Sequence, residues 1–238
     1  MFGLGTAINA AAIVAGGILG LLFGKLFKER IREGIVSAMA VSVIFIGIDG
    51  AVEKFMESYG PSSSEKSVML VVCLGLGTLI GELIDIDDLI FRFGEWLKKH
   101  TKSTGDTGFT DGFLTASVTV CIGAMSVVGA IEDGVHKNIS VLLIKALIDF
   151  ITIMFMTASM GKGCIFSAIP VILFQGSITL ISGVISPYLT ETALSDLSLV
   201  GSALIFCVGL SLLGIKKLKV ANMLPAVVLA VLWAYLPL

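Results

Sequence analysis

The chain has 238 residues, of which 56% are hydrophobic and only 14% are charged, and its mean hydropathy is +1.01. Soluble domains carry roughly 25% charged residues, so this composition excludes an ordinary soluble protein and indicates one that lies in a lipid bilayer. The net charge of −2 and the lack of a basic tract argue against a nucleic-acid partner. We therefore expect a single integral membrane domain over residues 1–238.

Apolar runs of about 20 residues, the length that crosses a bilayer, recur along the whole chain. They predict an all-α polytopic bundle of eight transmembrane helices, or of seven if the turn at 161–163 belongs to a re-entrant element. The predicted helices cover residues 4–24, 34–56, 67–90, 110–131, 139–160, 164–186, 196–214 and 218–237.

Lysine and arginine residues indicate the orientation of these helices. With the N-terminus outside, twelve of them lie in the inner connections, and only Lys54, Lys66 and Lys137 lie in the outer ones. Since basic residues accumulate on the cytoplasmic side, we expect both termini outside.

Residues 83–102 continue the third predicted helix with apolar residues at spacings of three or four. This pattern predicts an amphipathic helix along the cytoplasmic interface, with residues 88–107 as an insertion. The alternative is a gate or a partner-binding arm. The apolar positions are Leu83, Ile86, Ile90, Phe93 and Leu97.

An internal repeat relates residues 1–56 to residues 67–134, each of which we expect to be a helical hairpin. GLLFGKL from Gly20 matches GTLIGEL from Gly77, EGIVSA matches DGFLTA, and each copy ends in an Asp-Gly pair. Transporter folds are commonly built from such repeats, with the binding site between them.

The segment from Asp111 to Gly134 consists largely of Gly, Ala, Ser, Thr and Val. Small residues let helix backbones approach closely, so we expect this segment to be an inner wall of the bundle, with Ser126 facing a pathway. Asp111 fits either a helix cap or one end of a route for ions. Glu132 and Asp133 fit either outer-loop charges or an acidic mouth that concentrates cations.

Lys145 and Asp149 are spaced four apart inside an apolar run, so their side chains can meet on one helix face. Ionisable residues within a membrane usually face a bundle interior or a water-filled cavity, which makes this pair the main pathway candidate. The alternative is a structural ion pair near the outer interface, with Lys145 extending toward water.

Three amides, Asn9, Gln175 and Asn222, lie in apolar surroundings, where they must find partners. They fit either hydrogen bonds between helices or contact with a solute. Gly16, Gly20 and Gly24 form a double GxxxG pattern that indicates close helix packing, and such glycine faces make a homo-oligomer our expectation.

The sequence contains none of the common motifs of enzyme active sites. His100 and His136 are isolated, the four cysteines have no CxxC spacing, and no phosphate-binding or nucleophile-elbow motif occurs. We therefore expect no catalytic residue, no cofactor and no metal site.

Several segments together resemble a bacterial inner-membrane family, domain of unknown function 554. The resemblance covers nearly the whole chain and keeps the motif order, and it implies a polytopic protein of the bacterial inner membrane. It implies no substrate and no functional residues. The segments are GTAINAAAIVAGGILGLLFG, IGELIDIDDLIFRFGEWLKK, GFLTASVTVCIGAMSVVGAIEDG, LLIKALIDF, FSAIPVILFQGSITL and VGLSLLGIKKLKVANMLPA.

Our first hypothesis for function is a small secondary transporter or channel-like permease for a small ion or solute, in which acidic residues bind a coupling cation or a proton. The second is a non-transporting membrane scaffold or regulatory subunit, in which the buried polar groups only fix helix packing.

Overall fold

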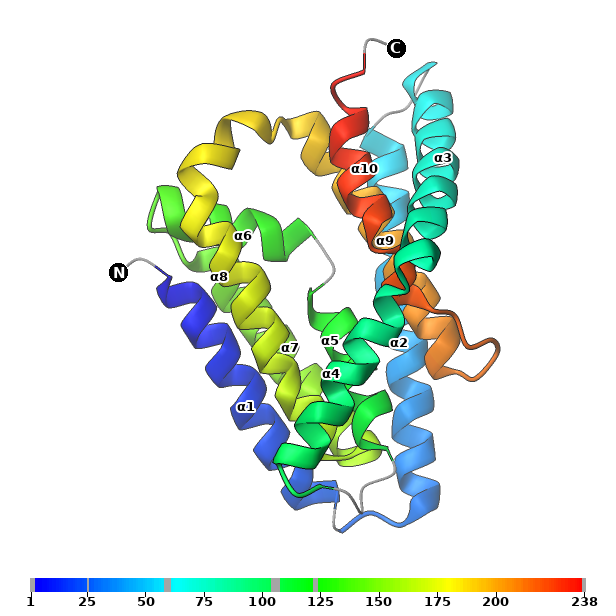
Figure 1. Ribbon diagram of the computed structural model, residues 1–238, viewed down its shortest axis with the longest axis vertical. Coiled ribbons are helices and arrows are strands. Elements are labelled where there is room, and N and C mark those ends of the chain that lie inside the picture. Colours follow the sequence, from blue (N-terminus) through cyan, green and yellow to red (C-terminus); the bar gives the residue numbers. More distant parts are fainter. Residues whose placement is uncertain (1–2, 25, 58–60, 104–107, 122–123, 237–238) are drawn as a thin grey trace. The chain divides into compact units, whose positions relative to one another are not determined.

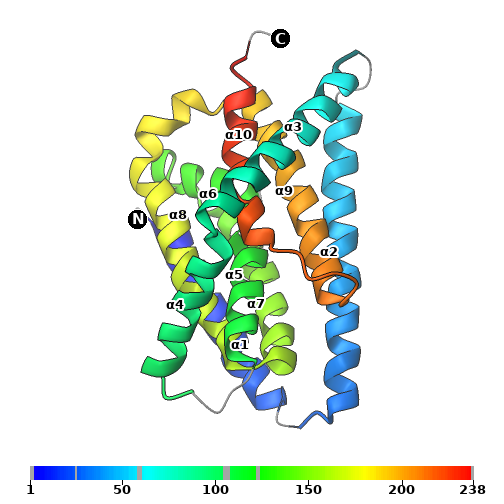
Figure 2. The same ribbon diagram turned by 45° about the vertical axis from the view of Figure 1, so that its right-hand side comes forward.

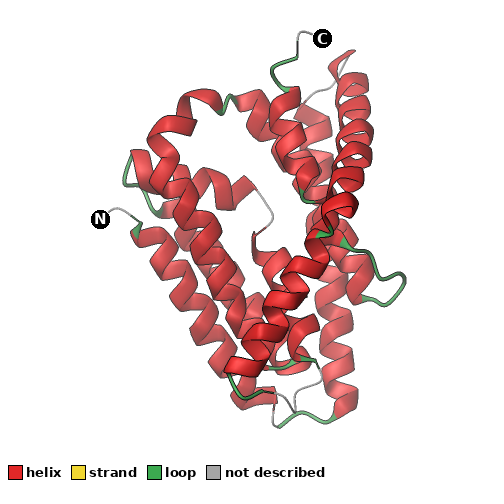
Figure 3. Ribbon diagram, viewed as in Figure 1, coloured by secondary structure: helices red, strands yellow, loops and turns green. Residues whose placement is uncertain are grey.

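The computed structural model describes residues 3–24, 26–57, 61–103, 108–121 and 124–236. Helices make up most of this part of the chain, and it contains no strand (Figure 3). The helices are α1 (Leu4–Gly24), α2 (Glu29–Glu57), α3 (Pro61–Ile84), α4 (Ile86–His100), α5 (Phe109–Cys121), α6 (Ala124–Val135), α7 (Ser140–Met160), η1 (Lys162–Ser167), α8 (Ala168–Ile185), η2 (Ser186–Tyr188), α9 (Glu191–Leu212), η3 (Val220–Met223) and α10 (Pro225–Trp233).

Six of the described helical segments are long and apolar enough to cross a membrane, and α5 with α6 gives a seventh if the two form one bent span. The six are α1, α2, α3, α7, α9 and the continuous segment Lys162–Tyr188. This confirms the prediction of an all-α polytopic bundle.

Three of the eight predicted helices differ in the structure. The helix predicted over 67–90 ends at Ile84. The helix predicted over 110–131 is broken into α5 and α6, which meet at 61°, within a segment rich in Gly, Thr and Val that favours helix only weakly. The helix predicted over 218–237 is only the shorter apolar segment Val220–Trp233, because Pro225 lacks an N–H and fits only the start of α10.

The turn at 161–163 separates two helices of membrane-spanning length, which favours two full spans over a re-entrant element. Gly161 has φ 93° and ψ −176°, a conformation in which a Cβ would be strained, so the chain can reverse there.

The residues fall into two compact units. Unit 1 comprises Met1–Met39, Leu89–Cys121 and Met125–Ser186, and unit 2 comprises Ala40–Asp88, Ile122–Ala124 and Pro187–Leu238. The expected single membrane domain and hairpin repeat stay predictions.

In unit 1, α1 runs alongside α7 (Figure 1). Gly16, Gly20 and Gly24 face the backbone carbonyls of Phe150, Met154 and Ala158, where any Cβ would collide. The double GxxxG pattern is therefore a packing face within the unit. A homo-oligomer stays a prediction, without these glycines to support it.

In unit 2, α3, α9 and α10 pack together (Figure 2). Gly77 and Gly81 of α3 lie against Ala226 and Asn222, and the core beside them contains Met69, Cys73, Leu199, Val200, Ala226 and Ala230. The matched glycine pairs of the two sequence copies thus both serve close packing.

The amphipathic segment is a separate helix, α4, rather than a continuation of α3. Asp85 has φ 55°, which ends α3. Acidic residues fill the first turn of α4 and basic residues its last turn, as the helix dipole favours. Residues 104–107 of the predicted insertion lie outside the described residues.

Candidate functional site

Lys145 and Asp149 of α7 form an ion pair, with Nζ 2.6 Å from Oδ2. Their spacing of four residues places both on one face of the helix. Lys145 is only 6% exposed and Asp149 only 4%, so the pair is buried in unit 1 and Lys145 does not extend to the surface.

The Lys145 ammonium also binds the end of the broken helix. Its Nζ donates to the Val120 carbonyl oxygen at 2.8 Å, and Val120 is the penultimate residue of α5. Carbonyls in the last turn of a helix have no partner within it and carry the negative end of its dipole, which favours a cation. The Ser126 hydroxyl, from the first turn of α6, donates to the same oxygen at 3.4 Å. Lys145 therefore joins α7 to the point where the helix breaks.

Asn9 of α1 and Gln175 of α8 extend this cluster. Asn9 Nδ2 donates to Gln175 Oε1 at 3.3 Å, and the Asn9 amide lies near the Asp149 carboxylate. Both amide side chains are fully buried. Within the described part of the chain, Asn9 Oδ1 and Gln175 Nε2 have no hydrogen-bond partner. The cluster thus contacts α1, α7, α8 and the break, and it holds an unused acceptor and an unused donor.

Asp133 of α6 is also fully buried in unit 1. Its Oδ2 accepts a hydrogen bond from the backbone N–H of Gly5, in the first turn of α1, at 2.9 Å. Glu132, in contrast, keeps a side chain that is 31% exposed and pairs with His136 at 3.2 Å. The two adjacent acids that the sequence treated alike therefore differ, and Asp133 lies inside the unit.

The sequence analysis did not predict that the Asp133 side chain is buried in the unit, although the residue spacing on α6 indicates it. Ser126, Ala130 and Asp133 follow one another at spacings of four and three, and all three are buried. The same spacing on α8 joins Gln175 to Thr179 and Ser182, which were not predicted and are also buried. Thr179 donates to the Ala130 carbonyl at 3.1 Å.

Two predicted site residues lie elsewhere. Asp111 lies in the first turn of α5 with an exposed side chain. Asn222 lies in η3 of unit 2, where its Oδ1 accepts from the Asp87 backbone N–H at 2.7 Å and its Nδ2 donates to Asp85 at 3.4 Å. Asn222 therefore caps the first turn of α4 and does not belong to the cluster around Lys145.

The charges beside Asn222 influence one another. Lys219 donates to Asp85 at 3.3 Å, and this hydrogen bond, with a smaller contribution from Asn222, lowers the pKa of the Asp85 carboxyl. Burial raises the pKa of Asp87. The pKa values of these two carboxyls are therefore shifted in opposite directions.

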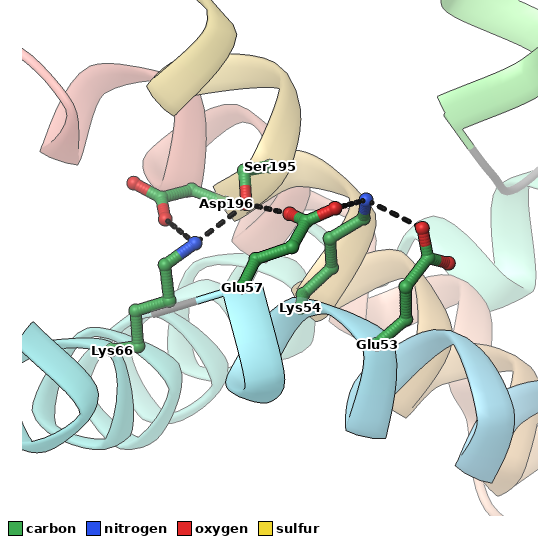
Figure 4. A network of polar contacts seen from close by, with 6 residues as sticks. All are labelled: Glu53, Lys54, Glu57, Lys66, Ser195 and Asp196. Carbon is green, nitrogen blue, oxygen red and sulfur yellow. Dashed lines mark hydrogen bonds and ion pairs between the residues drawn. The ribbon is translucent and has the colours of Figure 1, made fainter. Parts of the chain in front are cut away.

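A second polar network lies in unit 2 (Figure 4). Lys66 lies 3.5 Å from Asp196 and donates to Ser195 at 2.6 Å, while Lys54 bonds to both Glu53 and Glu57. A cavity of about 420 Å³ lies beside these residues. Because each lysine is paired with a carboxylate, we interpret the network as bracing between α2, α3 and α9. No group of three or more His, Cys, Asp or Glu side chains suited to a metal occurs in the described ranges.

Comparison with known proteins places this chain among bacterial membrane proteins. The family model described as "Protein of unknown function (DUF554)" matches residues 4–235. The uncharacterized membrane protein YdfK of Bacillus subtilis is 30% identical over 94% of this chain and 93% of its own length. The uncharacterized protein YqgA of Escherichia coli is 29% identical over 95% and 94% of the two chains. No solved structure matches.

Proposed function

Because this chain belongs to the DUF554 family, whose relatives named above carry no assigned activity, we propose a function from the buried cluster: a small secondary transporter or channel-like permease for a small ion or solute. We place it in the bacterial inner membrane with both termini outside.

The observation that carries this proposal is the buried Lys145–Asp149 pair at the break between α5 and α6. Transporters commonly bind substrates and coupling ions at discontinuous helices, where the ends of two half-helices supply unpaired backbone groups. Charged side chains within a membrane are costly, so they commonly mark a substrate or ion pathway.

The unused polar atoms of Asn9 and Gln175 support the same reading. A solute that offers one donor and one acceptor satisfies both atoms without disturbing the hydrogen bond between the two amides. Asp149 exchanges Lys145 for the solute or ion, while Lys145 keeps its bond to Val120. Transport then proceeds as α5 and α6 change their angle around this fixed site.

The test uses the purified full-length protein in liposomes. Proton, sodium, potassium and chloride gradients are followed with entrapped fluorescent indicators, and small neutral or zwitterionic solutes by light scattering. We expect at least one probe to move faster than in empty liposomes. Asp149→Asn should slow that movement at least about tenfold, the effect of roughly 1.4 kcal/mol on a barrier.

The matched control is Asp85→Asn, which makes the same chemical change in an exposed ion pair of unit 2. This variant should transport at the wild-type rate. Transport by a folded Asp149→Asn protein at the wild-type rate would remove Asp149 from the pathway.

A non-transporting scaffold or regulatory subunit is the second candidate, and the exposed apolar side chains of α4 favour it. Phe93 stacks on Trp96 with ring centroids 5.7 Å apart, and Trp96 is 51% exposed, so this helix offers a surface for a partner. The scaffold function is supported if no probe crosses the membrane and if Trp96→Ala releases a protein that otherwise co-purifies with the chain.

A further inference from the structure

Several buried polar atoms of unit 1 lack a hydrogen-bond partner among the described residues, although buried polar groups are nearly always paired. Four of them belong to residues that are at most 5% exposed and that lie around the first turns of α1. They are Thr6 Oγ1, Asn9 Oδ1, Asp133 Oδ1 and Gln175 Nε2. Bound water is the common partner of buried polar atoms of this kind.

The N-terminal part of α1 connects the two buried carboxyls of the unit. Gly5 binds Asp133 through its N–H, and Asn9 binds Gln175 and lies near Asp149. Thr6 and Asn9 are three residues apart, so they share a helix face. At 1.5 Å of rise per residue, Gly5 and Asn9 are separated by roughly 6 Å along the helix axis.

Asp133 keeps one carboxyl oxygen free inside the unit. Its Oδ2 accepts from the Gly5 N–H at the N-terminus of α1, where backbone N–H groups lack partners within the helix. Its Oδ1 has no hydrogen-bond partner among the described residues, although the side chain is fully buried.

The charged groups around Asp133 are paired with other residues. On its own segment, Glu132 is paired with His136. On α7, Leu142 packs beside Gly5 and Asp133, and the next charged residue, Lys145, is bonded to Asp149 and to Val120. On α1 and α8 the neighbouring polar groups, Thr6 and Ser182, carry no charge. None of the described cations lies within ion-pair distance of Asp133.

From this geometry we infer that the coupling ion is a proton, and that it moves between Asp133 and Asp149 along Thr6, Asn9 and intervening water. The inference rests on the proposed transport function and specifies its ion. A proton needs only one free carboxyl oxygen, and Asp133 Oδ1 is such an oxygen. No bond forms or breaks other than O–H bonds, and the proton that leaves one carboxyl reaches the other.

The first experiment detects the proton on Asp133 without any need for transport. Infrared difference spectra of the full-length protein in liposomes, recorded as the pH is changed, should show the C=O band of a protonated carboxyl that shifts in D₂O. Asp133→Asn keeps an oxygen for the Gly5 N–H and should remove this band. Asp111→Asn, on the exposed first turn of α5, should leave it in place. A spectrum unchanged by Asp133→Asn would overturn the assignment of Asp133.

The second experiment measures proton movement itself. Liposomes loaded with a pH-sensitive dye receive a potassium diffusion potential, with valinomycin as the potassium carrier. The wild-type protein should change the internal pH, Asp133→Asn should slow the change about tenfold, and Thr6→Val should slow it by a smaller factor. Equal unfolding temperatures confirm that the variants fold.

The outcomes separate this inference from the proposed function. If another probe crosses the membrane while the internal pH stays constant, the proposed transport function is supported and the proton is not the coupling ion. If nothing crosses, the transport function fails and proton coupling fails with it. In that case the infrared band still decides whether Asp133 holds a proton.

Discussion

The Lys145 ammonium has two oxygen partners, one on its own helix and one at the end of α5. A buried pair of this kind costs desolvation that its attraction roughly repays, so it adds little to stability by itself. Removal of only one partner leaves an uncompensated buried charge and costs about 3–5 kcal/mol. The placement of the pair at a helix break, rather than its energy, is therefore the reason to assign it a role in function.

Asn222 illustrates how a buried amide serves structure alone. Its two bonds hold the start of α4 to η3, and loss of such a cap costs about 1–2 kcal/mol. We predict that Asn222→Ala speeds hydrogen exchange in the first turn of α4 and lowers the unfolding temperature, while transport continues. Loss of transport in a folded Asn222→Ala protein would return this residue to the pathway.

Asp85 gives a prediction for pH. Because its pKa is lowered in the folded protein, its contribution to stability is present above the ordinary value of 3.8 and is lost as the pH falls through the lowered value. The protection against hydrogen exchange at the start of α4, measured relative to the intrinsic exchange rate at each pH, should therefore fall in acid below the ordinary range of aspartate. In Asp85→Asn this dependence on pH should disappear. If the variant shows the same pH profile as the wild type, Asp85 is not the group responsible.

At the scale of the helices, the contact of α1 with α7 depends on the absence of side chains at Gly16, Gly20 and Gly24. We predict that Gly20→Ala destabilises the protein, because the new Cβ would overlap the Met154 carbonyl. The matched control is Gly75→Ala on α3, where nothing lies within 4 Å of the added atom. That change should raise stability by about 1 kcal/mol through helix propensity. Thermal unfolding of both variants provides the comparison, and equal effects would contradict the packing of α1 on α7.

Most of the membrane-length helices could be predicted from the sequence, since the length of an apolar run reports directly on the thickness of the bilayer. The break between α5 and α6 could not, because small residues continue across it without a charge or a proline. The short α10 could have been expected from Pro225, which hydropathy alone ignores.

The candidate site was partly predictable for a similar reason. Lys145 and Asp149 are charged within an apolar run and share a helix face, so both the pair and its burial follow from the sequence. The spacing of Ser126, Ala130 and Asp133 indicates that they share a helix face, but only tertiary packing decides that this face of α6 meets the start of α1. The partners Val120 and Gly5 act through backbone atoms, which no sequence pattern marks.

At the scale of the whole molecule, the polar groups divide between the two units. Unit 1 contains the Lys145–Asp149 cluster, Asp133 and the broken helix, with unpaired polar atoms among them. Unit 2 contains the Lys66 and Lys54 networks, in which the charges are paired. This division is the reason that the proposed transport pathway lies in unit 1.

The most direct test of this account replaces both charges of the buried pair at once. The double variant Lys145→Met/Asp149→Asn keeps the volume of the pair and leaves no buried charge, so it should fold about as stably as the wild type. In liposomes we predict that it has lost the flux of the ion or solute that the wild type carries. A folded double variant that transports at the wild-type rate would contradict the claim that the pathway passes the pair.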